Sequence, residues 1–210
     1  RLLAPIMHDS DPVVRWAVNY LLRRGLTERD LWYFKFGLSS DPTMYRRVIM
    51  PSFDGAGVLN FFTGRAIDST TFRKYMNCET EKKAVIFNEL NIDWQKEITL
   101  VEGPFDLAKC DDNATCLLGS SLSEDSALFS MIYKHMTPVI LALDSDMVDK
   151  SWQRIARMLS KYDVSVRILP LGEFKDVGEM TKQQFLEAKT QAVEWDRMAA
   201  LSSKIQRMRI

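Results

Sequence analysis

Residues 97–118 read EITLVEGPFDLAKCDDNATCLL, and this stretch decides the predicted fold. Glu97–Val101 is rich in apolar and β-branched residues and predicts a strand. Pro104 then favours the first turn of a short helix that ends near Cys110. Thr115–Leu118 predicts the next strand, and an order of strand, helix, strand is the repeating unit of parallel sheets.

The same alternation continues toward the carboxyl end of the chain. Val139–Leu143 is a continuous apolar run, as expected of a strand that is buried on both faces of a parallel sheet. An amphipathic helix around Trp152–Leu159 follows, and it leads to a further strand at Val164–Leu169. We therefore expect an α/β fold, with a central and mostly parallel sheet flanked by helices over residues 93–178.

Residues 1–92 predict a smaller mixed unit of helices and a β-hairpin. Asp11-Pro12 is a suitable helix start, with Asp11 as the N-cap, and Gly25 ends the helix that follows. Val48–Pro51 and Val58–Arg65 predict two strands joined by a turn. Many of the basic residues lie in this unit, which we expect to form a subdomain in front of the α/β part.

The last segment, residues 179–210, predicts a single helix. Thr181 and Gln184 have the spacing of a capping box, and apolar residues then recur at helical spacing as far as Met208. The apolar stripe of this helix needs a partner surface, which we expect to be the body of the protein.

The charges of the chain balance. Lys and Arg together number 28, and Asp and Glu together number 28, so the net charge is zero. A tight nonspecific binder of nucleic acid usually has a strongly basic footprint, which the chain as a whole lacks. No apolar run approaches the ~18 residues that span a bilayer, so we expect no membrane partner.

The first residue and the cysteines bear on the compartment. The chain begins at Arg1 without an initiating Met or a signal-peptide pattern, so we expect it to be a piece of a longer cytoplasmic protein. Cys78, Cys110 and Cys116 include none of the closely spaced pairs typical of zinc sites. We expect no zinc site in this chain and a reducing compartment.

Acidic residues follow two of the predicted strands. Glu102 comes directly after the first strand, and Asp144 and Asp146 come directly after the Val139–Leu143 run. Sites in open parallel sheets form outside the carboxyl ends of the strands, where these carboxylates would repel one another without a cation. Oxygen ligands of this kind favour Mg²⁺ or Mn²⁺. A single Asp in such a place is equally well a turn former or a helix cap, and the prediction depends on the two strand ends together.

At this point two motifs resemble a known domain. Val101–Asp106 reads VEGPFD and is similar to the VEG-x-x-D motif of Toprim domains, and Asp144–Asp146 is similar to their DxD motif. Leu118–Leu122 fits the small-residue turn between the two motifs. Toprim domains occur in primases, topoisomerases and several nucleases, so this resemblance implies metal chemistry without fixing the reaction.

The segments upstream narrow the resemblance to one family. Arg47–Pro51 is similar to an RxxFP-like segment of primases, Gly57–Arg65 to their G-x-x-x-F-x-G-R hairpin, and Lys74–Asn77 to their K-Y-x-N segment. In this order, just before a Toprim motif, they resemble the RNA-polymerase core of bacterial and phage DNA primases over nearly the whole chain. The compact, divergent motifs favour a phage origin.

The resemblance implies a metal site made of carboxylates. The catalytic ligands of Mg²⁺ or Mn²⁺ would be Glu102, Asp144 and Asp146, and further members of the metal site would be Asp106 and Asp176. The chain departs from the family at one point, because many primases have a second acid two residues after the position of Asp176. Gly178 stands there instead, which puts a second metal in doubt unless Glu179 substitutes.

The resemblance also implies a basic cleft for the template and the incoming nucleotide. Its phosphate-binding residues would be Arg47, Arg65 and Lys74, and Asn77 would help to position the strand or the nucleotide. Tyr75 would stack on a base, or it would be an ordinary packing residue. For the two arginines the alternative is a solvated face of the hairpin.

The function that this resemblance implies is DNA-directed RNA polymerase activity, which makes short RNA primers on single-stranded DNA. The expected partners are the DNA template, ribonucleoside triphosphates, a replicative helicase and a zinc-binding template-recognition module; the compartment is the cytoplasm, that of the host if the protein is phage-encoded. Two alternatives stay open. One is a Toprim-type metal-dependent nuclease, and the other is a non-catalytic DNA-binding or loading module.

Overall fold

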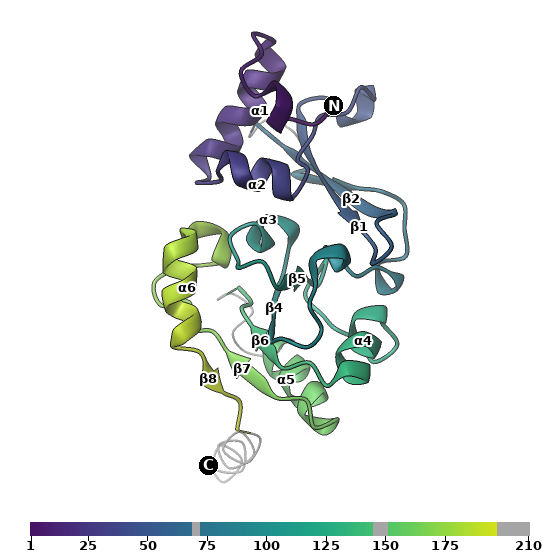
Figure 1. Ribbon diagram of the computed structural model, residues 1–210, viewed down its shortest axis with the longest axis vertical. Helices are drawn as coiled ribbons and strands as arrows, with labels where there is room; N and C mark the ends of the chain where they lie inside the picture. The colour runs from purple at the N-terminus through teal and green to yellow at the C-terminus, as the bar shows by residue number, and fades with distance from the viewer. Residues whose placement is uncertain (69–71, 145–150, 197–210) are drawn as a thin grey trace.

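The computed structural model describes residues 1–68, 72–144 and 151–196 (Figure 1). The amino-terminal part combines two helices with a three-stranded antiparallel sheet in the order β1-β2-β3. Its elements are α1 (Pro12–Arg23), α2 (Glu28–Tyr33), β1 (Arg47–Phe53), β2 (Leu59–Ala66) and β3 (Tyr75–Asn77). As predicted, the Asp11 side chain caps α1, and Gly25 directly after it has a positive φ of 73°.

The rest of the chain forms a five-stranded sheet in the order β5-β4-β6-β7-β8. The strands are β4 (Ile98–Val101), β5 (Ala114–Cys116), β6 (Val139–Leu141), β7 (Val166–Ile168) and β8 (Val193–Glu194), and the helices are α3 (Pro104–Leu107), α4 (Ala127–His135), α5 (Ser151–Lys161) and α6 (Lys182–Thr190). The first four strands are parallel and β8 is antiparallel to β7, which confirms the predicted α/β fold. None of the helices in the described ranges is long and apolar enough to cross a membrane.

Short 3-10 turns connect these elements. They lie at Ala4–Ile6, Pro42–Met44, Lys82–Ala84, Glu89–Asn91 and Val177–Glu179. The last of them directly precedes α6, and it becomes important at the site described below.

The central strands bury both faces, as their unbroken apolar runs predicted. In β6, Val139 and Leu141 belong to a cluster with residues of α4 and α5, whereas Ile140 and the following Ala142 belong to a cluster with residues of α1, α2, α3 and α6. The sheet is therefore a middle layer, covered by α4 and α5 on one face and by α3, α6 and the amino-terminal helices on the other.

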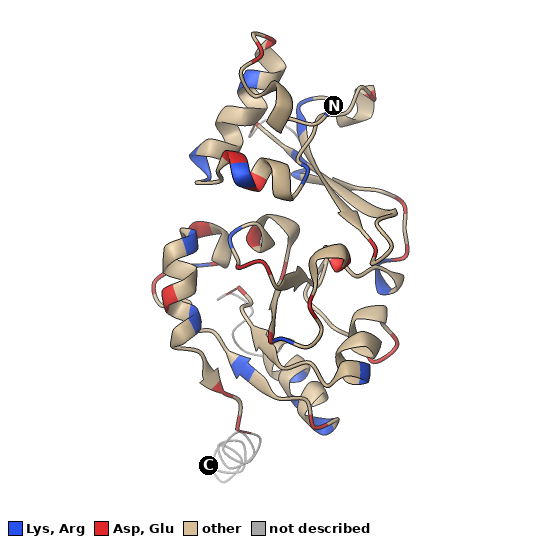
Figure 2. Cartoon of the chain, viewed as in Figure 1, with Lys and Arg blue, Asp and Glu red and all other residues tan. Residues whose placement is uncertain are grey.

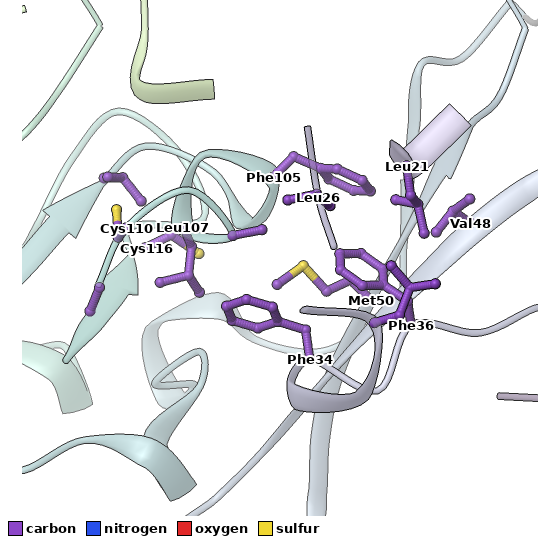
Figure 3. Packing of buried hydrophobic residues seen from close by; sticks show 14 of the residues in the cluster. Leu21, Leu26, Phe34, Phe36, Val48, Met50, Phe105, Leu107, Cys110 and Cys116 are labelled. Atoms are coloured by element: carbon purple, nitrogen blue, oxygen red, sulfur yellow. The ribbon is translucent and has the colours of Figure 1, made fainter. Parts of the chain in front are cut away.

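The second of these faces joins the two parts of the chain. Phe105 and Leu107 of α3 pack into one buried cluster with side chains of the amino-terminal part (Figure 3). Figure 3 shows Leu26, Phe34 and Met50 among the partners. Because this apolar seam is continuous, the groups at its edge have fixed positions relative to one another.

The carboxyl end differs from the predicted single helix over residues 179–210. The capping box of Thr181 is confirmed, but α6 ends at Thr190, and the chain then adds β8 to the edge of the sheet. The edge of β7 forms hydrogen bonds with this segment instead. The Trp195 backbone N–H donates to the Val166 carbonyl at 2.8 Å, and the Arg167 guanidinium donates to the Ala192 carbonyl at 3.0 Å. Tertiary hydrogen bonds thus override the helical periodicity. Residues 197–210 lie outside the described part.

Candidate active site

An open cavity of about 640 Å³ lies between the carboxyl ends of the sheet strands and the β2–β3 hairpin. Five carboxylates line it: Glu102, Asp106, Asp144, Asp176 and Glu179. Figure 2 shows acidic segments in red around α3 and at the end of β6, next to the amino-terminal part. The structure therefore brings together Glu102 and Asp144, which the sequence placed at two separate strand ends.

The pKa of Asp144 reflects both its burial and the acids around it. Burial raises its pKa to about 7, and the negative charges of Asp106, Glu102 and Asp176 contribute to the rise. A carboxyl group whose pKa is raised by other carboxylates is in a place where a cation would be stabilised.

Asp106 behaves in the same way at the start of α3. Burial raises the pKa of Asp106 to about 6, and repulsion from Asp176 adds to this effect. The Gly103 N–H, which donates to Asp106 Oδ2 at 3.2 Å, opposes the rise, as do the charges of Arg24 and Arg65. Asp106 is thus held by α3 and lies between the acidic and the basic sides of the cavity.

Gly178 closes one side of this carboxylate group. A Cβ atom at this residue would lie 2.6 Å from Asp106 Oδ1, 3.0 Å from Asp176 Oδ1 and 3.2 Å from Arg24 Nη2. The backbone of the 3-10 turn therefore approaches the acids as closely as a glycine allows. A side chain at position 178 would therefore have to displace the side chain of Asp106.

The opposite side of the cavity is basic. Arg65 and Lys74 of the β2–β3 hairpin lie there, with Thr63, Tyr75 and Asn77. Arg24, Lys82 and Lys175 also line the cavity, and Lys175 directly precedes Asp176 in the sequence. The Arg65 guanidinium donates a hydrogen bond to the Tyr75 hydroxyl and lies 4.9 Å from the ring centre of Phe105. These contacts hold Arg65 at the cavity by cation–π attraction as well as by a hydrogen bond.

Tyr75 is both a packing residue and a cavity residue. Its ring centre lies 6.1 Å from that of Phe105, and its side chain also lines the cavity. Burial raises the pKa of Tyr75 to about 12, although the positive charge of Arg65 opposes this effect. The packing contact of Tyr75 is thus observed, and its stacking on a base stays a prediction.

The raised pKa of Tyr75 leads to a prediction on stability in alkali. A phenol with a higher pKa in the folded state than in the unfolded state, where it is about 10, stabilises the fold at neutral pH. That contribution is lost as the pH rises from about 10 through about 12. We expect the stability of Tyr75→Phe to fall less over this interval than that of the parent, in urea titrations at several pH values. Equal slopes in the two proteins would contradict the assignment.

Arg47 lies behind the cavity and not in its lining. Only 4% of Arg47 is exposed, and its guanidinium donates to the backbone carbonyls of Arg73 at 2.7 Å, Gly64 at 3.3 Å and Lys74 at 3.4 Å. Neither the expected phosphate contact nor a solvated hairpin face describes this placement. Arg47 instead ties the segment before β3 to the β1–β2 hairpin.

Sequence reasoning missed two cations of the site. Arg24 follows α1 and lines the cavity, 6.0 Å from the ring centre of Phe105. Lys82 lines the cavity as well and donates to the Leu118 carbonyl at 2.9 Å. The neighbouring Lys83 instead forms a surface ion pair with Asp125. The sequence did contain a signal for the position of Arg24. Gly25 marks the end of α1, so Arg24 lies at the end of that helix.

The donor set of the cavity matches a hard divalent cation in kind. It consists of carboxylates, and the pKa values of Asp106 and Asp144 are raised by burial and, to a lesser extent, by the charges of neighbouring carboxylates. In residues 1–68, 72–144 and 151–196, however, no three His, Cys, Asp or Glu side chains converge closely enough to hold one metal ion. The predicted ligand Asp146 lies outside the described residues.

No family model matches the chain. It is 25% identical over 177 residues to the DNA primase of Listeria innocua, an alignment that covers 78% of this chain and 28% of that protein. Among solved structures, the Aquifex aeolicus primase with its zinc-binding and RNA polymerase domains matches with a TM-score of 0.72 and 22% identity, over 92% of this chain and 60% of that one. The chain has the fold of the DnaG primase core.

A second solved structure supports the same conclusion. A DnaG primase catalytic domain bound to single-stranded DNA matches with a TM-score of 0.69 and 19% identity, over 92% of this chain and 79% of that domain. The DnaG-type core thus accounts for nearly all of this chain, whereas the chain spans less than a third of its curated primase relative.

Proposed function

We propose that this chain is the polymerase core of a DNA primase, which joins ribonucleotides into short RNA primers on a single-stranded DNA template. The observation that carries the proposal is one cavity lined by both carboxylates and cations, at the carboxyl ends of parallel strands. The similarity to primases in sequence and fold supports it.

In this proposal the basic side binds phosphate groups. Lys74 is exposed at the cavity and would contact the template backbone or the triphosphate, and Arg65 would do so from its fixed position over Phe105. Tyr75 offers a ring to a base, and Asn77 offers an amide beside it. Binding through phosphate contacts weakens as salt rises, since counterions are released.

The acidic side would perform the chemistry. The metal ligands of the proposal are Glu102, Asp144 and Asp146, with Asp106 and Asp176 as further members. In sites of this kind a bound Mg²⁺ or Mn²⁺ activates the attacking hydroxyl and stabilises the leaving oxygen. The reaction is attack by the 3′-hydroxyl of the primer on the α-phosphate of an incoming ribonucleoside triphosphate, with release of pyrophosphate.

The proposal includes partners beyond the site. A zinc-binding module would select the start sequence, and the matched Aquifex structure contains such a domain next to its polymerase domain. The core has no net charge, so it would bind its template weakly by itself. A replicative helicase would keep the core on the template. The cytoplasm is the proposed compartment, because replication of the chromosome or the phage genome takes place there.

The test is extension of a short RNA annealed to single-stranded DNA, with ribonucleotides and Mg²⁺ or Mn²⁺. An annealed primer avoids the initiation step that a zinc-binding module would control. We expect the parent to extend the RNA and Asp144→Asn to be slower by about a hundred-fold or more, because an oriented charge that stabilises the transition state contributes on this scale.

Three other outcomes would reject the proposal or a part of it. Metal-dependent nicking of the DNA without extension would show the nuclease alternative. Binding of single strands with neither extension nor nicking would show the loading module. Equal extension by the parent and Asp144→Asn would keep the polymerase but remove Asp144 from its site.

A further inference from the structure

Asp30 and Lys182 form a buried ion pair behind the cavity, between α2 and α6. Lys182 Nζ donates to Asp30 Oδ1 at 2.5 Å, and only 1% of the Asp30 side chain is exposed. The other oxygen, Oδ2, accepts from the Thr27 N–H at 2.8 Å and from the Thr27 hydroxyl at 2.7 Å. Both oxygens of Asp30 are therefore in use, one in the cap of α2 and the other in a bond to an element 152 residues away.

Asp30 also counters a group of positive charges. Burial by itself raises the pKa of Asp30, but the hydrogen bonds from Lys182 and Thr27 outweigh burial and leave the pKa below its usual value. Nearby, Lys109 is 3% exposed, and the pKa of Lys109 is lowered by burial and by Arg24, whereas Asp30 opposes that shift. Asp30 thus offsets the positive charges of Lys109 and Lys182, and Arg24 is a third cation close to Lys109.

Each of these cations belongs to an element that carries a residue of the cavity. Arg24 itself lines the cavity, and Lys109 follows Asp106 by three residues, its N–H donating to the Asp106 carbonyl at 2.9 Å. Lys182 is the first residue of α6, and the turn Val177–Glu179 lies directly before it. Since Gly178 leaves no free space against Asp106, a small shift of this turn changes the arrangement of the acids.

We propose that the Asp30–Lys182 pair is a positioning device for the reaction: it holds the turn that carries Asp176 against Asp106 and Arg24. The inference rests on the proposed function for its catalytic consequence only. Neither residue lines the cavity, so the pair acts through the turn and not on the substrate.

The test compares two lysines of α6. Lys182→Met removes the pair with Asp30, whereas Lys189→Met removes the ion pair between Lys189 and Asp111 at the far end of the same helix, also 2.5 Å long and partly buried. Lys182→Arg keeps the charge. Hydrogen exchange of residues 176–180 is measured by mass spectrometry, because the amides of Glu179 and Met180 bond within this turn, to Asp176 Oδ1 and the Val177 carbonyl. Primer extension and urea stability are measured in parallel.

We expect Lys182→Met to speed exchange of residues 176–180 by about ten-fold or more through local opening. Its kcat for extension should fall by roughly ten- to hundred-fold, as misplaced reacting groups do, with the KM for ribonucleotides nearly unchanged. Lys189→Met should lose similar stability with neither effect, and Lys182→Arg should resemble the parent. Unchanged exchange in Lys182→Met, or equal effects of Lys189→Met, would overturn the inference. If the parent itself extends no primer, the proposed function fails, and the exchange measurement alone still decides on the positioning.

Discussion

If the proposed function holds, Gly178→Ala is expected to slow primer extension by roughly ten- to hundred-fold, because it displaces Asp106 of the proposed metal site. The added Cβ would lie 2.6 Å from Asp106 Oδ1, a distance that real Cβ contacts do not show. Asp106 is half-buried, and its carboxylate accepts a hydrogen bond from the Gly103 N–H, so we expect a shift of this carboxylate to strain that bond. We expect a stability loss of about 1–3 kcal/mol as well, which is usual for an overpacked site.

Gly119→Ala is the matched control for this substitution. Gly119 lines the same cavity, but a Cβ built there meets no atom within 4 Å. Extension rates of the two variants, measured at a temperature well below unfolding, separate crowding at Asp106 from a general sensitivity of the cavity. If Gly178→Ala extends primers as fast as Gly119→Ala, then Asp106 and the turn are not closely packed in the working enzyme.

An acidic residue at position 178 is disfavoured by charge as well as by space. Gly178→Asp would follow the family pattern, but it would add a charge where burial and three acids already raise the pKa of Asp144 to about 7. It would also meet the steric limit of the alanine variant. The close packing and the crowded negative charge around Gly178 both disfavour an acidic residue at this position in this chain.

The sequence predicted the sheet and the acids well for a physical reason. Strands buried on both faces must be continuously apolar, and Val139–Leu143 shows such a run, so the positions of Glu102 and Asp144 at the strand ends followed from local pattern alone. The end of α6 could not be predicted in this way. There the helical spacing up to Trp195 competes with a sheet edge that is formed by a distant strand, β7.

The cationic residues of the site were harder to predict from the sequence, since the direction of a long side chain gives no periodic signal. Arg24, Lys82 and Arg47 all lie in basic runs, and the sequence does not show which guanidinium or amine turns toward the cavity. The decisive contacts are long-range: Arg24 meets Phe105 of α3, and Lys82 meets the carbonyl of Leu118. Such contacts depend on how the two parts of the chain pack.

Arg47 and Lys74 provide the second prediction, because the resemblance implied a phosphate-binding role for both and the structure buries one and exposes the other. Arg47→Met should lower the free energy of unfolding by about 2–4 kcal/mol, since it leaves buried carbonyls without their charged donor. Lys74→Met should leave stability within about 0.5 kcal/mol, as exposed substitutions usually do. Its effect should instead be weaker binding of template DNA with a smaller salt dependence, because one phosphate contact is lost.

Urea unfolding and DNA binding at two salt concentrations distinguish these roles. For Arg47→Met we expect normal template affinity per folded molecule, because the guanidinium is occupied by the carbonyls of Gly64, Arg73 and Lys74 and does not reach the cavity. The reverse result, a stable Arg47→Met protein that binds template poorly, would mean that Arg47 leaves its carbonyl partners when DNA binds. The role that the sequence resemblance implied for Arg47 would then be correct for the complex.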